Sequence, residues 1–548
     1  MSPWKRLSIV FFALAVCLTL RAWGQEERHQ HAASSGEKLG HVKFPVSCND
    51  AAQKEFERGV AMLHSFWYEE AEKTFTVVTQ ADPTCAMGYW GVAMSLYHPI
   101  WGEPLNAAGL KKGWEVIEKA KAADSKKPRE RDYVAAIESY YKDSDKLDHP
   151  ARVLAYEMAM ERVYLRYPED REAGVFYALA LLSTAPITDK TYANQKKAMS
   201  ILEKVLAAKP DHPGVTHYII HACDSPEMAP HGLAAARRYA KIAPSVPHAL
   251  HMPSHIFTRL GLWQESIESN TAAASAARDY AIRANFGAWD QQLHAMDYLA
   301  YAYLQGAQDL EAKQVLDELI AIRKVQPENL TSAFGFAAIP ARYALERRRW
   351  ADAAALELQP SWFPWSRYPW PAATFYAAHG LGAARSGRPG DAQKDLERIE
   401  AMHKTFADAN QGYWADLVEI MRLEVAAWIA RAESKNDKAL KLMRSAAELE
   451  ASTDKHNVTP GPILPARELL GDLLVELDQP AQALPEYEAS LHDAPNRFNS
   501  LYGAARSAEL SGQREKARTY YAKLVEGSKA ADGDRPELRQ AKTLLARK

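Results

Sequence analysis

The stretch GVAMLHSFWYEEAEKTFTVVTQADP, residues 59–83, decides the fold of this chain. Small residues stand at Gly59 and Ala71, where they allow the two helices of a hairpin to approach closely. An aromatic residue follows at Phe75, and Pro83 ends the second helix because a proline cannot continue the helical hydrogen-bond ladder. The stretch therefore predicts a helical hairpin that stops at a defined residue.

The same spacing recurs near the other end of the chain, first in Gly471, Ala483, Tyr487 and Pro495, and then in Gly512, Ala517 and Tyr521. This pattern resembles the tetratricopeptide repeat (TPR), whose period is about 34 residues. The resemblance implies an all-α, TPR-type α-solenoid: a right-handed superhelix of helical hairpins with irregular helical insertions. We expect it to cover residues 49–548, with clear repeats near 51–98, 211–310 and 464–530.

Composition excludes several classes of function. The chain has 548 residues, 67 lysines and arginines against 69 acidic residues, and a net charge of −2. A balanced charge of this kind provides no field that favours nucleic acid. After the N-terminal segment, no stretch approaches the roughly 20 uninterrupted apolar residues that a membrane-spanning helix needs. We therefore expect no nucleic-acid partner and no membrane span.

The N-terminus predicts export. Lys5 and Arg6 precede an apolar run over residues 7–20, which is typical of a cleavable signal peptide over residues 1–24. The product is expected to be periplasmic or secreted. Residues 25–48 are polar and turn-rich, and we expect a flexible polar arm there. In such a compartment Cys48 and Cys85 either form a disulfide or remain two small apolar residues, and the sequence leaves both alternatives open.

A histidine ladder is the main functional signal. His217 and His221 recur 34 residues later as His251 and His255, and His248 is added one turn upstream in the second copy. Residues four apart in a helix lie on the same face, so each pair forms a ready chelating unit. The TPR resemblance implies that all five, together with Asp224 and Arg259, face the concave surface.

These pairs predict a mononuclear transition-metal site. Adjacent helices lie roughly 8 to 10 Å apart, a gap that opposed imidazoles from His217, His221, His251 and His255 can close around one ion. Imidazole ligands suit copper, zinc, iron and nickel, and the sequence does not choose among them. No phosphate-cradling glycine loop is present, so neither a nucleotide nor a flavin cofactor is indicated.

Further residues are weaker candidates. Asp224 is expected to ligate the ion or to orient an imidazole, and His294 with Asp297 offers another ligand or an acid–base pair. His64 and His98 are also one period apart and extend the same groove in the TPR register. We treat them, with His248 and Arg259, as secondary candidates.

The runs around His217, His248 and His294 resemble those of a group of exported bacterial TPR proteins with paired H-x-x-x-H helices, a group whose activity is uncharacterised. The resemblance therefore supplies no reaction. Two hypotheses follow. One is a metal-dependent protein, including an enzyme that acts on a small-molecule substrate. The other is a periplasmic scaffold whose groove binds a peptide or partner protein without metal. No H-E-x-x-H helix or nucleophile elbow points to a standard hydrolase.

Overall fold

The computed structural model describes residues 36–100 and 104–546. The expected signal peptide over residues 1–24 and the first part of the expected arm, residues 25–35, lie outside the described residues. Everything below concerns the compact unit that extends from Lys38 onward.

The regular secondary structure of the described residues is almost entirely helical. The α-helices run in the order α1 Asp50–His64, α2 Tyr68–Ala81, α3 Ala86–Leu96, α4 Ala107–Ala122, α5 Pro128–Tyr141, α6 His149–Arg166, α7 Arg171–Ser183, α8 Ala193–Ala208, α9 Pro213–Ala222, α10 Ala229–Ile242, α11 Pro247–His251, α12 Pro253–Arg259, α13 Trp263–Arg283, α14 Asp290–Gln305, α15 Asp309–Ala321, α16 Leu330–Leu345, α17 Trp350–Ala353, α18 Pro369–Arg385, α19 Pro389–Asp408, α20 Gly412–Ala432, α21 Asn436–Ser452, α22 Ala466–Glu476, α23 Pro480–Asp493, α24 Phe498–Leu510, α25 Arg514–Gly527 and α26 Pro536–Ala546. A short 3-10 helix, η1, covers Trp365–Arg367, and two-residue strands β1 (Ala288–Trp289) and β2 (Val325–Gln326) pair in parallel with Ala288 opposite Val325.

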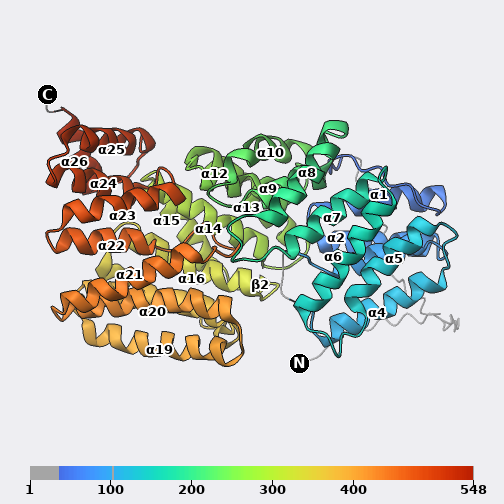
Figure 1. Cartoon of the computed structure of the whole chain (residues 1–548), viewed down its shortest axis with the longest axis horizontal. Helices are drawn as coiled ribbons and strands as arrows, with labels where there is room; N and C mark the ends of the chain where they lie inside the picture. The colour runs from blue at the N-terminus through green and yellow to red at the C-terminus, as the bar shows by residue number, and fades with distance from the viewer. Residues whose placement is uncertain (1–35, 101–103, 547–548) are drawn as a thin grey trace, which may run out of the picture. The chain divides into compact units, whose positions relative to one another are not determined.

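Helices that follow each other in the chain pack against each other, and many also touch the next but one, as α1 touches α2 and α3 and α18 touches α19 and α20. Figure 1 shows this succession of hairpins from α19 to α26. The expected all-α solenoid is therefore the architecture of the described residues. None of the described helices combines the length and the apolar content that a membrane-spanning helix needs.

The repeat motif packs as its residue types predict. A Cβ added at Gly59 would stand 2.8 Å from the Phe75 ring, and one added at Gly471 would stand 2.7 Å from the Tyr487 ring. Both glycines thus permit a helix contact that any side chain would push apart. Helix α2 ends at Ala81, two residues before Pro83.

Two contacts between distant helices position the candidate site. Helix α9 packs on α1, and α24 packs on α14. In addition, the connection between α21 and α22, residues 453–465, lies against α16, because the Arg342 guanidinium donates to the carbonyls of Gly461 (2.8 Å) and Pro462 (3.0 Å). The centre of the fold therefore combines early helices with a segment from late in the chain.

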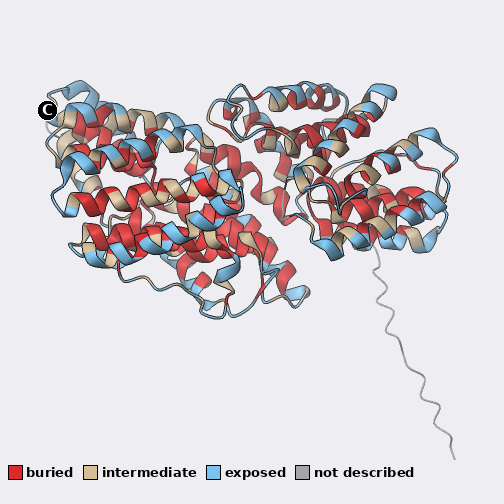
Figure 2. Cartoon of the chain, turned by 60° about the horizontal axis from the view of Figure 1, so that its bottom comes forward, coloured by how far each residue is buried: buried red, intermediate tan, exposed pale blue. Residues whose placement is uncertain are grey.

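Helix α14 lies at this centre and is buried along nearly its whole length. Figure 2 shows most other helices with buried residues on one side and exposed residues on another. A helix buried all round is normally apolar, yet α14 carries Gln291, His294 and Asp297. Buried polar groups need partners, so this helix points to the functional region.

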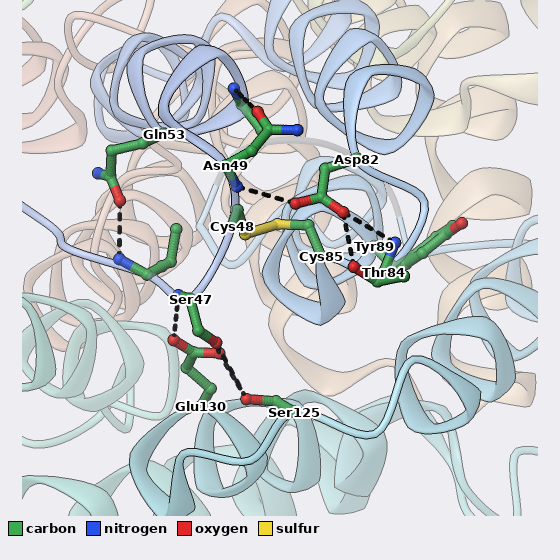
Figure 3. The surroundings of a disulfide bond; sticks show 12 residues. Ser47, Cys48, Asn49, Gln53, Asp82, Thr84, Cys85, Tyr89, Ser125 and Glu130 are labelled. Carbon is green, nitrogen blue, oxygen red and sulfur yellow. Dashed lines mark hydrogen bonds between the residues drawn. A yellow bond between two sulfur atoms is a disulfide. The ribbon is translucent and has the colours of Figure 1, made fainter.

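The N-terminal segment differs from the expected flexible arm. Residues 38–41 hydrogen-bond to the segments that precede α9 and α11, through Asp211 and Ser245. Phe44 is fully buried, and the Ser47 N–H donates to Glu130 Oε1 at 2.6 Å. Cys48 forms a disulfide with Cys85, so the bridged alternative holds in this structure (Figure 3). The hydrogen bond from the Asn49 N–H to Asp82 Oδ2 (2.9 Å) ties the same two segments together. The sequence interpretation treated this segment as polar, but burial of the apolar Phe44 side chain anchors it.

Candidate metal centre

Six histidines from four helices, α9, α11, α12 and α14, gather in the middle of the fold. α9 supplies His217 and His221, and α14 supplies His294. The second ladder copy is broken between α11 and α12 at Met252, because Pro253 begins a new helix; α11 carries His248 and His251, and α12 carries His255. The break does not separate the pair, since His251 and His255 keep their ring centroids 5.0 Å apart.

The six imidazoles form two triads. The first consists of His217, His221 and His248, and the second of His251, His255 and His294. Within each triad, one ligand atom per residue lies within 4.8 Å of the others. The arrangement differs from the single four-histidine site expected from the sequence: each i, i+4 pair is completed by a third histidine rather than by the other pair.

Hydrogen bonds fix the orientation of five of the six rings. Each donates from Nδ1 to an oxygen: His217 to the His64 carbonyl (2.7 Å), His248 to Gln291 Oε1 (3.1 Å), His251 to Asn270 Oδ1 (2.6 Å), His255 to Asp224 Oδ2 (2.8 Å) and His294 to the Val458 carbonyl (3.1 Å). A neutral imidazole with its proton on Nδ1 presents a lone pair at Nε2, the form in which histidine ligates a metal.

The Nε2 atoms converge. His251 Nε2 lies 3.1 Å from His255 Nε2, and His217 Nε2 lies 3.1 Å from His221 Nε2. In the pair of His251 and His255 both protons are on Nδ1, so two lone pairs face each other with no hydrogen between them. Two nitrogens bound to one zinc or copper ion at about 2.0 Å lie about 3 Å apart, so a cation between them removes the conflict.

All six imidazoles are held neutral. Burial lowers the pKa of each one below the ordinary value, and it lowers the pKa of His248 to about 3. Neighbouring imidazoles add to the effect, since protonation of one disfavours that of the next. Metal binding requires deprotonated ligands, and this environment supplies them at neutral pH.

Asp224 connects the cluster to two cations. Besides accepting from His255, its carboxylate accepts from Arg259 Nε (2.8 Å) and Lys455 Nζ (3.1 Å). Burial raises the pKa of Asp224, but the two cations outweigh burial and hold that pKa well below its usual range. The carboxylate is therefore ionised and orients His255 as an outer partner, and the Tyr298 hydroxyl lies 3.3 Å from the same Nδ1.

Aromatic rings cover the first triad. The Phe66 ring centroid lies 4.4 Å from that of His217, 5.4 Å from that of His221 and 5.5 Å from that of His248. Phe66 holds a φ of 54°, a left-handed conformation that costs a non-glycine residue about 1 kcal/mol or more. The backbone of Phe66, in the turn after α1, is therefore strained, and this conformation places the apolar ring against three imidazoles.

One side of the cluster opens to a pocket. A pocket of about 300 Å³ is lined by His221, Asp224, Arg259 and Lys455, with Tyr192 and Tyr413 on its walls. His221 is half-buried, whereas His251, His255 and His294 are each at most 2 % exposed. A small molecule in the pocket therefore meets His221 of the first triad and no histidine of the second.

A third group, His64 with Glu172 and His212, has a different pattern of hydrogen bonds. His64 Nε2 and His212 Nε2 lie 2.8 Å from the two Glu172 oxygens, and the Tyr218 hydroxyl lies 2.9 Å from His64 Nδ1. Burial raises the pKa of Glu172, but the two imidazoles outweigh it and hold that pKa well below its usual range. Protons already fill the space between ligand atoms here, so the group is a hydrogen-bonded network.

The remaining candidates lie outside the two triads. Asp297 pairs with Arg342 at 2.8 Å in a buried ion pair, so it supports α14 and α16. His98 stacks on Tyr68 with centroids 3.9 Å apart, and burial lowers its pKa to about 4. The sequence register placed His98 with the ladder; in the structure His98 belongs to neither triad, and its ring stacks on Tyr68, which in turn stacks on Phe66.

Sequence reasoning identified Asp224 as an outer partner of an imidazole, but it missed the other residues that accept from Nδ1 and the segment that closes the second triad. Asn270 and Gln291 are single amides within helices, and neither has a motif that distinguishes it. Val458 and Lys455 lie more than 150 residues after His294. The only available signal was the turn-rich composition of residues 453–465, which predicts a loop but not which part of the fold the loop packs against.

Comparisons with known proteins add little. No protein-family model matches the sequence, and no curated protein matches it. Among solved structures, the chain is similar to one titled Naa15/Naa10 bound to HypK-THB, with 12% identity, a TM-score of 0.23, and coverage of 90% of this chain and 73% of that one. It is also similar to yeast Tom70, with 13% identity, a TM-score of 0.32, and coverage of 90% and 95%. Scores of this size carry no conclusion about function.

Proposed function

We propose that this chain is an exported solenoid protein that binds a transition metal in its six-histidine cluster. The observation that carries the proposal is the pair of Nε2 atoms of His251 and His255, 3.1 Å apart, with both Nδ1 protons committed to acceptors. Two facing lone pairs in a buried site repel each other, and a bound cation turns this repulsion into coordination.

The donor set defines the class of metal. All six donors are imidazole nitrogens, without thiolates, which suits copper, zinc, nickel or iron rather than calcium or magnesium. The carboxylate nearest to them, Asp224, accepts from His255 as an outer partner. Such partners fix the ring orientation and raise ligand basicity. When bound, an ion of this class supplies Lewis-acid or redox chemistry, and Arg259 and Lys455 face a ligand that enters the adjacent pocket.

Export is part of the proposal. It is supported by the charged and apolar pattern of residues 1–24 and by the disulfide between Cys48 and Cys85, because disulfides persist mainly in oxidising compartments. In that setting the protein would meet metal ions from outside the cytosol, where cytosolic chelators do not control them.

The competing hypothesis is a scaffold that binds a peptide or partner protein in the groove. The second triad is already covered by residues of the chain itself, since His294 donates to the Val458 carbonyl and Tyr298 to the Thr459 carbonyl (3.1 Å). A peptide over this surface would have to displace residues 453–465. Burial on this scale favours a small bound species over a protein ligand.

Metal analysis tests the proposal. The mature protein, purified without an affinity tag, is to be dialysed against copper, zinc, iron or nickel in turn and washed, and its metal content measured by mass spectrometry. We expect retained metal in wild-type protein and loss of most of it in the double variant His221→Ala/His255→Ala. No retained metal with any of the four ions would refute the proposal.

A matched control separates site from surface effects. His231 is an exposed histidine on α10, so His231→Ala removes an imidazole from the same region without touching the cluster. Its metal content should equal that of wild type. Circular dichroism of each variant in chelator verifies that loss of metal does not follow from loss of fold.

A further inference from the structure

The six histidines contain two complete ligand sets. We infer that the cluster holds two transition-metal ions as neighbours, one bound by His217, His221 and His248 and the other by His251, His255 and His294. The inference rests on the proposed metal binding, and it adds the number of ions and a difference between them. A single shared ion is the arrangement that the repeat register predicts.

Distances favour two ions over one. Ring centroids within the first triad are 4.8 and 5.0 Å apart for His217 with His221 and with His248. Those within the second triad are 4.2, 5.0 and 5.9 Å apart. The contacts that join the triads are longer, 6.2 Å from His248 to His251 and 6.3 Å from His221 to His255. Three imidazoles with a fourth position open are the ligand set of a catalytic zinc site, so each triad is sufficient for one ion.

Charge gives the pocket a role. The six ligands are neutral, and Asp224 is already shared by two cations, so two adjacent metal ions need a further negative charge. A small anion, such as hydroxide or azide, meets this need when it occupies an open coordination position. The pocket beside His221 is the route by which it arrives from solvent.

The two ions are expected to differ in the rate at which they are released to solution. In the first triad His217 and His248 are buried, but half-buried His221 lines the pocket and gives its ion a route to chelators. The second triad is at most 2 % exposed at every histidine and is covered by the backbone of Val458. Release of the second ion requires residues 453–465 to move, which makes it the slower of the two.

The test combines stoichiometry with release kinetics. Full-length mature protein is loaded with Zn²⁺, and bound zinc per chain is measured before and during challenge with a coloured chelator. His248→Ala removes a ligand of the first triad and His294→Ala one of the second, while His231→Ala is the control. His248→Asn and His294→Asn leave smaller cavities and replace the alanine variants if these fail to fold.

We expect two ions in wild type and control, released in a fast and a slow phase of equal size. His248→Ala should keep one ion and the slow phase, and His294→Ala should keep one ion and the fast phase. One ion per wild-type chain, lost in both variants, would overturn the two-ion inference and leave the proposed function intact. Two ions released at one rate would overturn the assignment of the exposed position. No zinc, and none of the other metals of the first test, would refute the proposed function itself.

Discussion

Two buried histidine clusters lie close together in this protein, and they are built for opposite purposes. In the group of His64, Glu172 and His212, each imidazole points an N–H at a carboxylate oxygen 2.8 Å away. In the pair of His251 and His255, each N–H points outward to an acceptor and the bare nitrogens face each other. The first arrangement is complete without a ligand, whereas the second leaves two bare nitrogens face to face, the place where we propose that a cation binds.

The difference teaches that the partner of Nδ1, more than the number of histidines, distinguishes the proposed metal site from a hydrogen-bonded network. His64 takes part in both clusters. Its ring belongs to the closed network through Glu172, and its carbonyl accepts from His217 of the open one at 2.7 Å. The network therefore holds the first triad in place, and each of the following experiments separates the two roles.

Acid should produce the largest effect, and it should come from the six-histidine cluster. Because burial lowers the pKa of all six, they stay neutral in the folded chain when unfolded histidines take up protons below about pH 6.5. The stability they contribute is complete above that pH and is lost as pH falls, by up to about 1.4 kcal/mol per pH unit for each histidine.

Urea unfolding in chelator at pH 7.5, 6.5 and 5.5 measures this loss, and we expect several kcal/mol over the range. Glu172 does not add to this loss of stability between pH 7.5 and 5.5. A carboxylate whose pKa is lowered in the folded chain keeps its stabilising contribution until the pH falls below the unfolded pKa of about 4.5. Equal stability at pH 7.5 and 5.5 would show that the cluster is not held neutral.

Removal of the shared carboxylate tests the closed network. Glu172→Ala leaves two buried N–H groups, those of His64 and His212, without their acceptor, and each such loss is worth about 1–3 kcal/mol. We expect the free energy of unfolding to fall by about 3 kcal/mol or more while zinc stoichiometry stays unchanged. Glu169→Ala, an exposed acid just before α7, is the control and should change neither quantity. A third zinc in wild type that is lost from the folded Glu172 variant would instead identify this group as a metal site, whereas loss of the fast phase alone would show that the network positions the first triad.

The sequence was sufficient for whatever depends on local spacing. The hairpin of residues 59–83, the contact of Gly59 with Phe75 and the same-face pairs His217–His221 and His251–His255 all follow from helical and repeat periods. The sequence also predicted the correct helix face for His248, because the register of a single repeat determines that face.

The division into triads could not be predicted in the same way. His294 joins His251 because α14 packs beside α11, and their ring centroids lie 4.2 Å apart, but no repeat signature sets the phase of α14. Asp297 illustrates the same limit: one turn from His294 it suggested acid–base work, whereas Arg342, 45 residues later, pairs with it. Contacts across such separations depend on packing rather than on a pattern.

Neutralising the outer carboxylate should weaken metal binding moderately. Asp224→Asn keeps the shape of the side chain but removes the charge that orients His255, and loss of such a partner typically lowers metal affinity about 10–100-fold. Competition with a calibrated zinc chelator measures the change. Asp454→Asn is the matched control, since this nearby carboxylate pairs with Lys190. Equal affinity in the two variants would show that Asp224 serves only the ion pairs with Arg259 and Lys455.

The smallest effect is expected at His98, which shares its repeat register with His64 but belongs to neither cluster. Its ring stacks on Tyr68 and its Nε2 donates to the Ser95 carbonyl at 3.1 Å, so His98→Ala removes one ring contact and one hydrogen bond. Such a change lowers the free energy of unfolding by about 1–2 kcal/mol. Zinc stoichiometry and both release phases should match wild type, because Phe66, and not His98, contacts the first triad. The Tyr68 ring also stacks on Phe66, with centroids 5.3 Å apart. A missing fast phase in this variant would therefore mean that the stacked rings of His98, Tyr68 and Phe66 position His221.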